Sequence, residues 1–287
     1  MVNQTKLIPV IGTENENRSG DIIFVHGLGG DALSTWHPQG KAELENSWLT
    51  WLGEDLEDVG IWTIAYAAEP FRIRGDTLPL AERATDIVEL LNENELGTRP
   101  IIFVTHSMGG LVVKQLLRNA CDYGNSDWKK ILGQTKGIVY LSTPHSGSNI
   151  ANWLKYIGSL VGRSESVREL EANDSRLLEL LEVHRNHDVL SQIPIKVYYE
   201  TKPTRGVFVV DRTSANPGIK GANPLPVEKD HIAIAKPKSR EERPYKGVRA
   251  FIKEQLRQPL PPLNSADNTP ELELISDRSE SVAKKKD

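Results

Sequence analysis

The sequence has little cysteine and no excess of basic charge, and both features exclude classes of function. Its 287 residues include one cysteine, Cys121, which excludes an internal disulfide framework and a four-cysteine zinc site. The 35 lysines and arginines are outnumbered by 39 acidic residues, so no basic surplus offsets a nucleic-acid backbone. We therefore expect no nucleic-acid partner and a reducing compartment.

The sequence also lacks long apolar runs. No stretch approaches the roughly 18–20 apolar residues of a membrane-spanning helix, so we expect no transmembrane segment. Residues 1–10 contain a lysine and no extended apolar core, which does not match a secretory signal. These features predict a cytoplasmic protein, and contact with a membrane surface stays compatible with them. The sequence does not indicate an oligomeric state.

Short β-branched runs are abundant, and they alternate with longer segments of helical spacing. This alternation is typical of an α/β fold, in which a mostly parallel central sheet is flanked by helices. The predicted strands are residues 21–25, 61–65, 100–105, 137–141, 195–199 and 206–210. Two segments have the apolar spacing of a helix that packs on a sheet, namely Leu80, Ala84, Ile87 and Leu91, and then Val248, Phe251, Ile252 and Leu256.

Two stretches depart from this alternation. Residues 151–190 contain helical patches but no strand, which predicts a helical insertion that could cover a site as a lid. Residues 258–287 contain four prolines and no aromatic residue, a composition that buries too little apolar surface to fold. We therefore predict one domain over residues 1–257, followed by a disordered tail.

A candidate nucleophile lies between a predicted strand and a predicted helix. Ser107 follows the strand at 100–105, and Gly109 and Gly110 follow the serine. A serine on such a tight turn projects its hydroxyl, and the residues two before and two after it must be small because strand and helix approach closely. Thr105 departs from this pattern, since a glycine is usual there. A helix-capping role for Ser107 is the alternative.

The first predicted strand ends in a glycine-rich loop, His26 to Gly30. Two backbone N–H groups aimed at one point stabilise the oxyanion of acyl transfer, and glycines permit the close approach. We predict that Leu28 and Met108 are these donors. Neither of the glycine-rich phosphate-binding motifs is present, and the proposed chemistry requires no metal or organic cofactor.

Chain order selects the base among seven histidines. Where a serine nucleophile follows a strand in this way, the acid and then the histidine come later in the chain. His231 is the only histidine that follows both late strands, so we predict that it is the base. His145 is expected to pack near the site. His184 and His187 lack an evident third metal ligand, and we expect them at the surface.

Two acids compete to orient His231. Glu200 directly follows the predicted strand 195–199, and Asp211 directly follows the predicted strand 206–210. Either carboxylate would keep the imidazole in the tautomer that accepts the serine proton. Glu200 is favoured because it ends the penultimate strand, where the acid usually lies, and Asp211 stays the alternative.

Five segments together resemble the serine-active-site-containing, lipase-like α/β-hydrolases related to the GPI inositol-deacylase group. The segments are 24–30, 104–111, 140–147, 199–201 and 230–231, and the similarity spans about residues 20–257. The resemblance implies an α/β-hydrolase fold and the hydrolysis of small-molecule or lipid esters. It implies that threonine is acceptable at Thr105, and it strengthens Glu200 as the acid. His26, Gly27 and Trp153 are the expected pocket residues.

The sequence therefore predicts a carboxylic-ester hydrolase that forms an acyl-enzyme on Ser107, with His231 as base and Glu200 as the orienting acid. A non-catalytic α/β-hydrolase-fold interaction module is one alternative. An acyltransferase that uses the same three residues is another, because it differs only in the acceptor of the acyl group.

Overall fold

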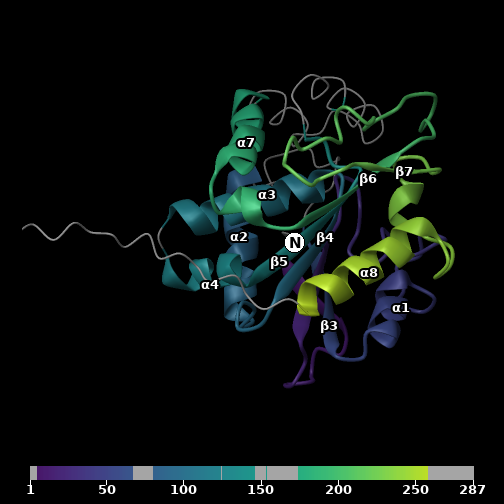
Figure 1. The fold of residues 1–287 in the computed structure, drawn as a ribbon. Helices are drawn as coiled ribbons and strands as arrows, with labels where there is room; N and C mark the ends of the chain where they lie inside the picture. The colour runs from purple at the N-terminus through teal and green to yellow at the C-terminus, as the bar shows by residue number, and fades with distance from the viewer. Residues whose placement is uncertain (1–4, 67–79, 124, 146–152, 154–173, 258–287) are drawn as a thin grey trace, which may run out of the picture.

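A seven-stranded sheet forms the centre of the molecule. The computed structural model describes residues 5–66, 80–123, 125–145, 153 and 174–257 (Figure 1). The strand order is β1-β3-β2-β4-β5-β6-β7, with β1 antiparallel to β3 and all other neighbours parallel. The strands are β1 Lys6–Ile11, β2 Gly20–Val25, β3 Val59–Ala65, β4 Ile101–His106, β5 Thr135–Leu141, β6 Ile195–Glu200 and β7 Leu225–Val227.

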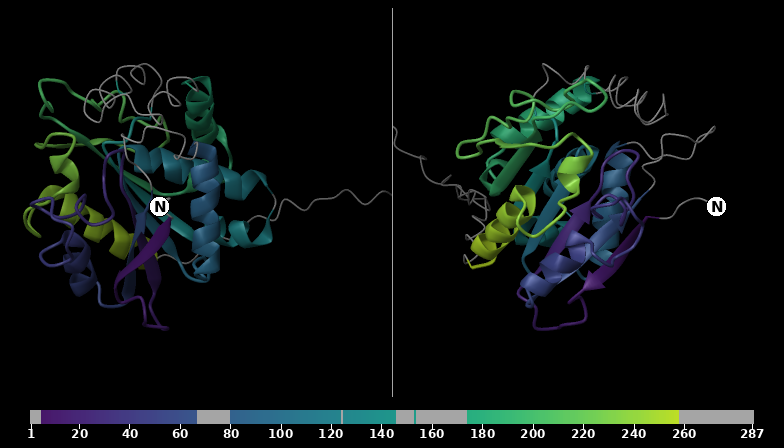
Figure 2. Two further views of the ribbon diagram at one scale, coloured as in Figure 1. Left: turned by 180° about the vertical axis from the view of Figure 1, so that it is seen from behind. Right: turned by 90° about the vertical axis from the view of Figure 1, so that its right-hand side faces the viewer.

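Helices cover both faces of this sheet (Figure 2). They are α1 Trp48–Asp55, α2 Leu80–Glu93, α3 Met108–Asp122, α4 Ser126–Gln134, α7 Asp174–Asn186 and α8 Arg243–Arg257, with short 3-10 turns at Leu190–Gln192 and Ala233–Ala235. Side chains of the central strands alternate between the two layers, as in β2, where Ile23 and Val25 pack with α2 and α3 while Ile22 and Phe24 pack with α1 and α8. The core is therefore divided by the sheet into two apolar layers.

Five of the six predicted strands are confirmed, and the sixth prediction is wrong. Residues 206–210 form a loop, because the N–H groups of Val209 and Val210 donate to the side chain of Glu200 rather than to a neighbouring strand. The edge position belongs instead to the three-residue β7. The sequence pattern also did not reveal β1, whose residues are half-buried or exposed and include Pro9.

Both predicted apolar helix faces are confirmed. Ala84, Ile87 and Leu91 of α2 are buried, as are Val248 and Ile252 of α8. Within the predicted helical insertion, the structure describes a helix at Asp174–Asn186 and a buried Trp153. Residues 151–152 and 154–173 of that insertion, and the predicted tail at 258–287, lie outside the described residues.

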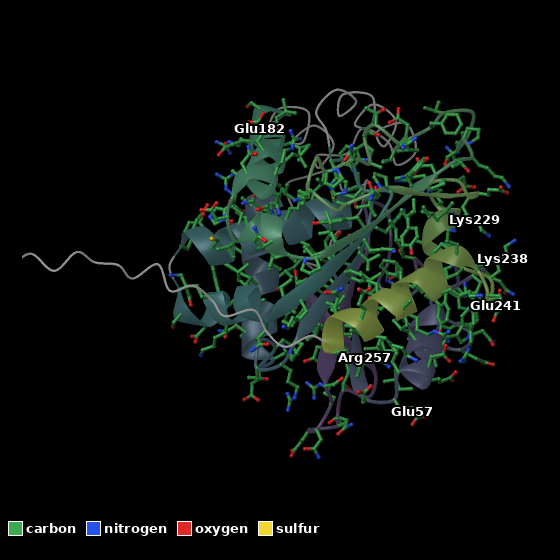
Figure 3. The ribbon with its side chains drawn as sticks, in the orientation of Figure 1. Glu57, Glu182, Lys229, Lys238, Glu241 and Arg257 are labelled. Carbon is green, nitrogen blue, oxygen red and sulfur yellow. The ribbon has the colours of Figure 1, made fainter. Side chains whose placement is uncertain are left out.

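Charged side chains project from the periphery of the layers. Glu182 on α7, Lys238, Glu241 and Arg257 are exposed and point outward (Figure 3). Among the residues that the structure describes, no helix is both long enough and apolar enough to cross a bilayer.

Candidate active site

Ser107 lies on a strained turn between β4 and α3. Its backbone has φ +51° and ψ −122°, a conformation that costs a non-glycine residue about 1–3 kcal/mol. Three hydrogen bonds hold the turn, since Ser107 N–H donates to the Leu141 carbonyl at 3.0 Å while the Ser107 carbonyl accepts from Gly110 N–H at 3.1 Å and from Thr143 Oγ1 at 2.9 Å. The side chain does not cap the helix, so the helix-cap reading of Ser107 is wrong.

The residues around the serine meet the space requirement of this turn. A Cβ on Gly109 would lie 2.2 Å from the Val25 carbonyl oxygen, because α3 begins directly against the end of β2. A Cβ on Gly110 would lie 2.3 Å from Thr143 Oγ1. Thr105 fits at the other side because its hydroxyl donates to the Val139 carbonyl of β5 at 2.9 Å. Thr105 thus faces the neighbouring strand β5, whereas the close approach of α3 to β2 is at Gly109.

The structure brings His231 to the serine across 124 positions of the chain. Its Nε2 lies 2.9 Å from Ser107 Oγ, and both residues are buried. The imidazole belongs to the segment between β7 and α8, which is held on two sides. The His231 N–H donates to Thr204 Oγ1 at 2.9 Å, and its carbonyl accepts a hydrogen bond from His106 Nε2 at 2.7 Å. Burial lowers the pKa of His106 to about 3, with the neighbouring His231 as the next cause, so this donor is a neutral imidazole.

Glu200 lies on the opposite side of the His231 ring. Its Oε1 is 3.5 Å from His231 Nδ1, a contact without hydrogen-bond geometry, so Nδ1 has no hydrogen-bond partner in the described part of the chain. The same Oε1 accepts from Val209 N–H at 3.0 Å and Val210 N–H at 2.5 Å, and Ser142 Oγ donates to Oε2. Catalytic hydrogen bonds are often long before a substrate binds, so a shift of a few tenths of an ångström would complete this one.

Asp211 occupies a different environment. It is exposed, and its Oδ1 accepts from the N–H of Ser214 at 2.8 Å and from Ser214 Oγ at 2.9 Å. The acid therefore caps a turn, which is a common use of aspartate in loops. The prediction that Asp211 ends a strand fails with the strand itself.

The two predicted oxyanion donors flank the serine. Gly27 lies directly against it, since a Cβ on Gly27 would be 2.8 Å from Ser107 Cβ. Leu28 follows Gly27, and Met108 begins α3 directly after the serine. Neither the Leu28 N–H nor the Met108 N–H has an acceptor among the described residues, which leaves both groups available to an oxygen atom near Ser107 Oγ.

His26 stiffens the loop behind these donors. Its ring stacks on Tyr66 with centroids 4.3 Å apart, and its Nδ1–H donates to the Gly27 carbonyl at 2.9 Å. Burial lowers the pKa of His26 to about 4, which keeps the ring neutral. Trp153 is buried in the apolar layer that contains α3 and α7. The pocket roles of His26, Gly27 and Trp153 stay predictions.

Three contributors to this arrangement were not predicted. Ser142 donates to Glu200, and Thr204 accepts from the His231 N–H. His106 donates to the His231 carbonyl. Ser142 has φ +48° and lies directly after β5, so its place at the carboxyl end of a central strand was the available signal. Thr204 gives no comparable signal, because it lies in a loop between β6 and β7.

His184 and His187 lie on and directly after α7. His184 is buried rather than at the surface, so that prediction is wrong, and its Nε2 donates to the Lys114 carbonyl at 2.7 Å. His187 is half-buried, with Nε2 3.4 Å from Cys121 Sγ. Over the described ranges, no three His, Cys, Asp or Glu side chains are grouped as they would be around a metal ion.

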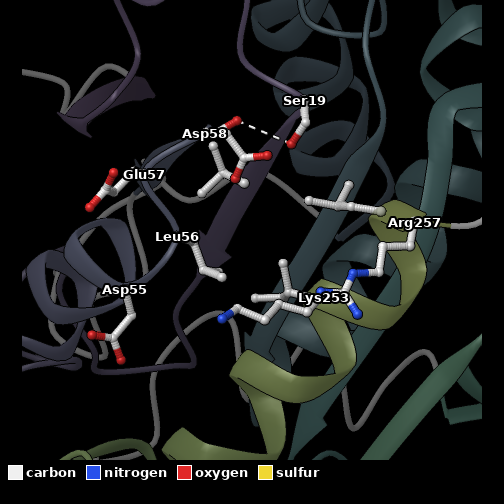
Figure 4. A pocket seen from close by; sticks show the side chains of 10 residues that line it. Ser19, Asp55, Leu56, Glu57, Asp58, Lys253 and Arg257 are labelled. Carbon is white, nitrogen blue, oxygen red and sulfur yellow. Dashed lines mark hydrogen bonds between the residues drawn. The ribbon is translucent and has the colours of Figure 1, made fainter.

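One cleft of the molecule lies at the opposite edge of the sheet from Ser107. It has a volume of about 350 Å³ and is bounded by Asp55, Glu57, Asp58, Lys253 and Arg257 (Figure 4). The cleft lies where β2 and β3 begin, whereas Ser107 follows the end of β4. In open parallel sheets, ligands bind beyond the carboxyl ends of the strands, so the cleft is at the wrong edge of the sheet for the chemistry of Ser107.

Solved structures with the same arrangement of strands and helices identify the fold. The mature lipase BlEst2 of Bacillus licheniformis aligns with a TM-score of 0.57 and 16% sequence identity, over 88% of this chain and 98% of the lipase. Est1E of Butyrivibrio proteoclasticus, solved with ferulic acid bound, aligns with a TM-score of 0.56 and 12% identity over 88% and 96% of the two chains. The chain has the α/β-hydrolase fold.

Curated relatives have a higher sequence identity. Protein SERAC1 of Bos taurus is 31% identical over 269 residues, and Protein SERAC1 of Homo sapiens is 29% identical over 262 residues. Each match covers 84% of this chain but only 39% of the relative, so the chain spans about two-fifths of the length of these proteins. No protein-family model matches the sequence.

Proposed function

We propose that this chain is a serine hydrolase that cleaves carboxylic esters through an acyl-enzyme on Ser107. The main support is the 2.9 Å contact between Ser107 Oγ and His231 Nε2 at the carboxyl edge of an α/β-hydrolase sheet. A nucleophile within hydrogen-bond reach of a base that a third group can orient is the arrangement used for acyl transfer. Glu200 is our proposed orienting group.

In the acylation step, Ser107 Oγ attacks the ester carbonyl carbon while His231 Nε2 accepts the hydroxyl proton. The Leu28 and Met108 N–H groups then donate to the oxyanion of the tetrahedral intermediate. When the intermediate collapses, the bond to the alcohol oxygen breaks and His231 returns its proton to that oxygen. Glu200 stabilises the imidazolium that forms between these two events.

In the deacylation step, water takes the place of the alcohol. His231 accepts a proton from the water as its oxygen attacks the acyl carbon, and then protonates Ser107 Oγ as the acid product leaves. This sequence consumes one ester and one water and yields one acid and one alcohol, so it requires no metal or organic cofactor.

The substrate class that we propose is a small-molecule or lipid ester. A series of p-nitrophenyl esters from acetate to palmitate measures the acyl-chain preference. A preference confined to short chains would exclude a lipid pocket, whereas retained activity on long chains would support one. The same assay with an added alcohol acceptor, followed by product analysis, distinguishes hydrolysis from acyl transfer.

The decisive experiment is labelling by a fluorophosphonate, which reacts with activated serines. We expect the folded wild-type protein to be labelled at Ser107, and Ser107→Ala to lose both the label and several orders of magnitude of turnover. Ser126→Ala, at an exposed position of α4, is the matched control and should behave as wild type. A folded wild-type protein that takes up no label would favour the non-catalytic interaction module.

A further inference from the structure

A small cavity is lined by residues of α3, β5 and α7, and neither Ser107 nor Glu200 lines it. Its volume is about 10 Å³, enough for one water-sized or monatomic group. Its polar lining comes from Lys114 of α3, His145 after β5 and His184 of α7, with the ring of Tyr140 beside them and apolar side chains such as Leu190 closing it. None of the three polar side chains has a role in the proposed ester hydrolysis.

Lys114 carries a buried ammonium group, and no acceptor for it is found among the described residues. The residue is 3% exposed, and no carboxylate or carbonyl among the described residues accepts a hydrogen bond from Nζ. Nζ lies over the face of the Tyr140 ring, 5.6 Å from the ring centroid. A cation–π contact replaces only part of the lost hydration, because a buried charge requires a partner. Burial lowers the pKa of Lys114 to about 7.

The ring of His145 is a second buried polar group at this cavity. The residue is 1% exposed, and its ring packs edge-on against Tyr140 with centroids 4.5 Å apart; neither ring nitrogen has a hydrogen-bond partner in the described part of the chain. Burial, followed by the charge of Lys114, lowers its pKa well below the usual value, so the ring is neutral with one N–H donor. Buried polar atoms without partners are rare in proteins, and a bound water or ion is a common explanation.

The neighbouring charges indicate the sign of the missing group. Within the described ranges, Arg185 acts on Lys114, and Lys114 and His184 act on His145; none of these groups is acidic. His184 is committed elsewhere, because its Nε2–H donates to the Lys114 carbonyl. An ammonium and an imidazole N–H around a monatomic space therefore form a donor set that suits an anion. The cavity is too small for phosphate or for a carboxylate from solution.

We infer that this cavity binds one halide-sized anion, with chloride as the physiological candidate, between Lys114 Nζ and the His145 ring. The anion neutralises the buried ammonium and joins α3, α7 and the segment after β5. Because it binds the folded chain and has no site in the unfolded chain, it raises the stability of the protein with its concentration.

The test compares thermal unfolding in sodium gluconate with unfolding in sodium chloride or bromide, at equal ionic strength. We expect the Tm of the wild-type protein to be about 3 °C higher or more once the halide exceeds its Kd tenfold. Lys114→Met keeps the length of the side chain and removes the charge, so its Tm should not distinguish the anions. Lys130→Met, at an exposed position of α4, is the control for general salt effects and should keep the wild-type difference.

Crystals soaked in bromide supply a direct reading that does not depend on any variant folding. We expect an anomalous peak in the cavity, within hydrogen-bond distance of Lys114 Nζ. A cavity without that peak, or a halide effect on Tm that persists in Lys114→Met, would overturn the proposal and leave a water molecule as the occupant. Both readings are independent of ester hydrolysis, so they also apply to Ser107→Ala.

Discussion

The carboxylate of Glu200 illustrates what a single position in the sequence can and cannot reveal. Its place directly after a buried strand was sufficient to select it over Asp211 as the candidate acid. The sequence could not show that the predicted strand at 206–210 is a loop whose Val209 and Val210 N–H groups bind that carboxylate. The run looked like a strand because it is apolar and β-branched, although in the structure only Val209 and Val210 are buried whereas Val207 and Phe208 are exposed.

Substitution of the two acids tests the assignment. Glu200→Gln should lower kcat by about 10²–10⁴-fold, because a neutral amide cannot stabilise the His231 imidazolium. Asp211→Asn should leave kcat within about threefold of wild type, since Asp211 caps an exposed turn. The measurement is kcat on a p-nitrophenyl ester, with unfolding midpoints to confirm that both variants are folded. The reverse order of the two effects would identify Asp211 as the acid.

His106 offers a second test, because it donates to the His231 backbone carbonyl and its ring lies beside the His231 ring, with centroids 5.1 Å apart. We expect His106→Leu to lower kcat by about tenfold with little change in KM, since the His231 segment loses the hydrogen bond that positions it. His106→Gln can donate from a similar point and should restore most of the rate. Equal losses in both variants, accompanied by equal losses of stability, would instead indicate a packing role.

At the scale of elements, the central strands were predictable and the sheet edges were not. Strands β2, β4 and β5 are buried on both faces, so their sequences are continuous apolar runs. The edge strands β1 and β7 have exposed positions and contain Pro9 and Pro226, which weakens the pattern. The glycines after Ser107 were predictable because strand and helix must approach closely there, although the sequence could not give the distance.

The close approach of α3 to β2 predicts that a glycine-to-alanine substitution in this helix destabilises the protein. Alanine normally stabilises a helix relative to glycine, but a Cβ on Gly109 would meet the backbone oxygens of Val25 and His26 at 2.2 and 2.5 Å. We therefore expect Gly109→Ala to lower the free energy of unfolding by about 1–3 kcal/mol, measured by urea denaturation. Lys129→Ala on the exposed face of α4 should change it by less than about 0.5 kcal/mol. A more stable Gly109→Ala protein would contradict the close packing of α3 on β2.

At the scale of the whole molecule, the layers bury an unusual number of histidines. His26, His106, His145 and His184 are all buried, and desolvation lowers the pKa of each of them. The sequence could identify these residues but not their burial, because a histidine in a loop or on a helix is more often exposed. Their burial becomes apparent only when β2, β4, β5 and α7 are assembled around the same edge of the sheet.

This burial predicts how stability depends on pH. In the unfolded chain these histidines have a pKa near 6.5, whereas the folded values are about 4 for His26 and about 3 for His106 and His184. Above pH 6.5 these histidines are neutral in both the folded and the unfolded chain, so they do not change the free energy of unfolding with pH. Below it the unfolded chain binds protons that the folded chain does not, so each histidine lowers the free energy of unfolding by about 1 kcal/mol per pH unit.

We therefore expect urea midpoints to be level above pH 7 and to fall steeply between pH 6.5 and 5, before the ordinary carboxylates titrate. Lowered carboxylate pKa values, as at Asp31 and Asp55, act at a separate and lower pH, because their contribution is lost only as pH falls below 3.8. His184→Gln keeps a donor for the Lys114 carbonyl and removes one titrating group. Below pH 6.5, the slope of its free energy of unfolding against pH should correspond to about one bound proton fewer than in the wild type. An unchanged slope would show that His184 is protonated in the folded protein.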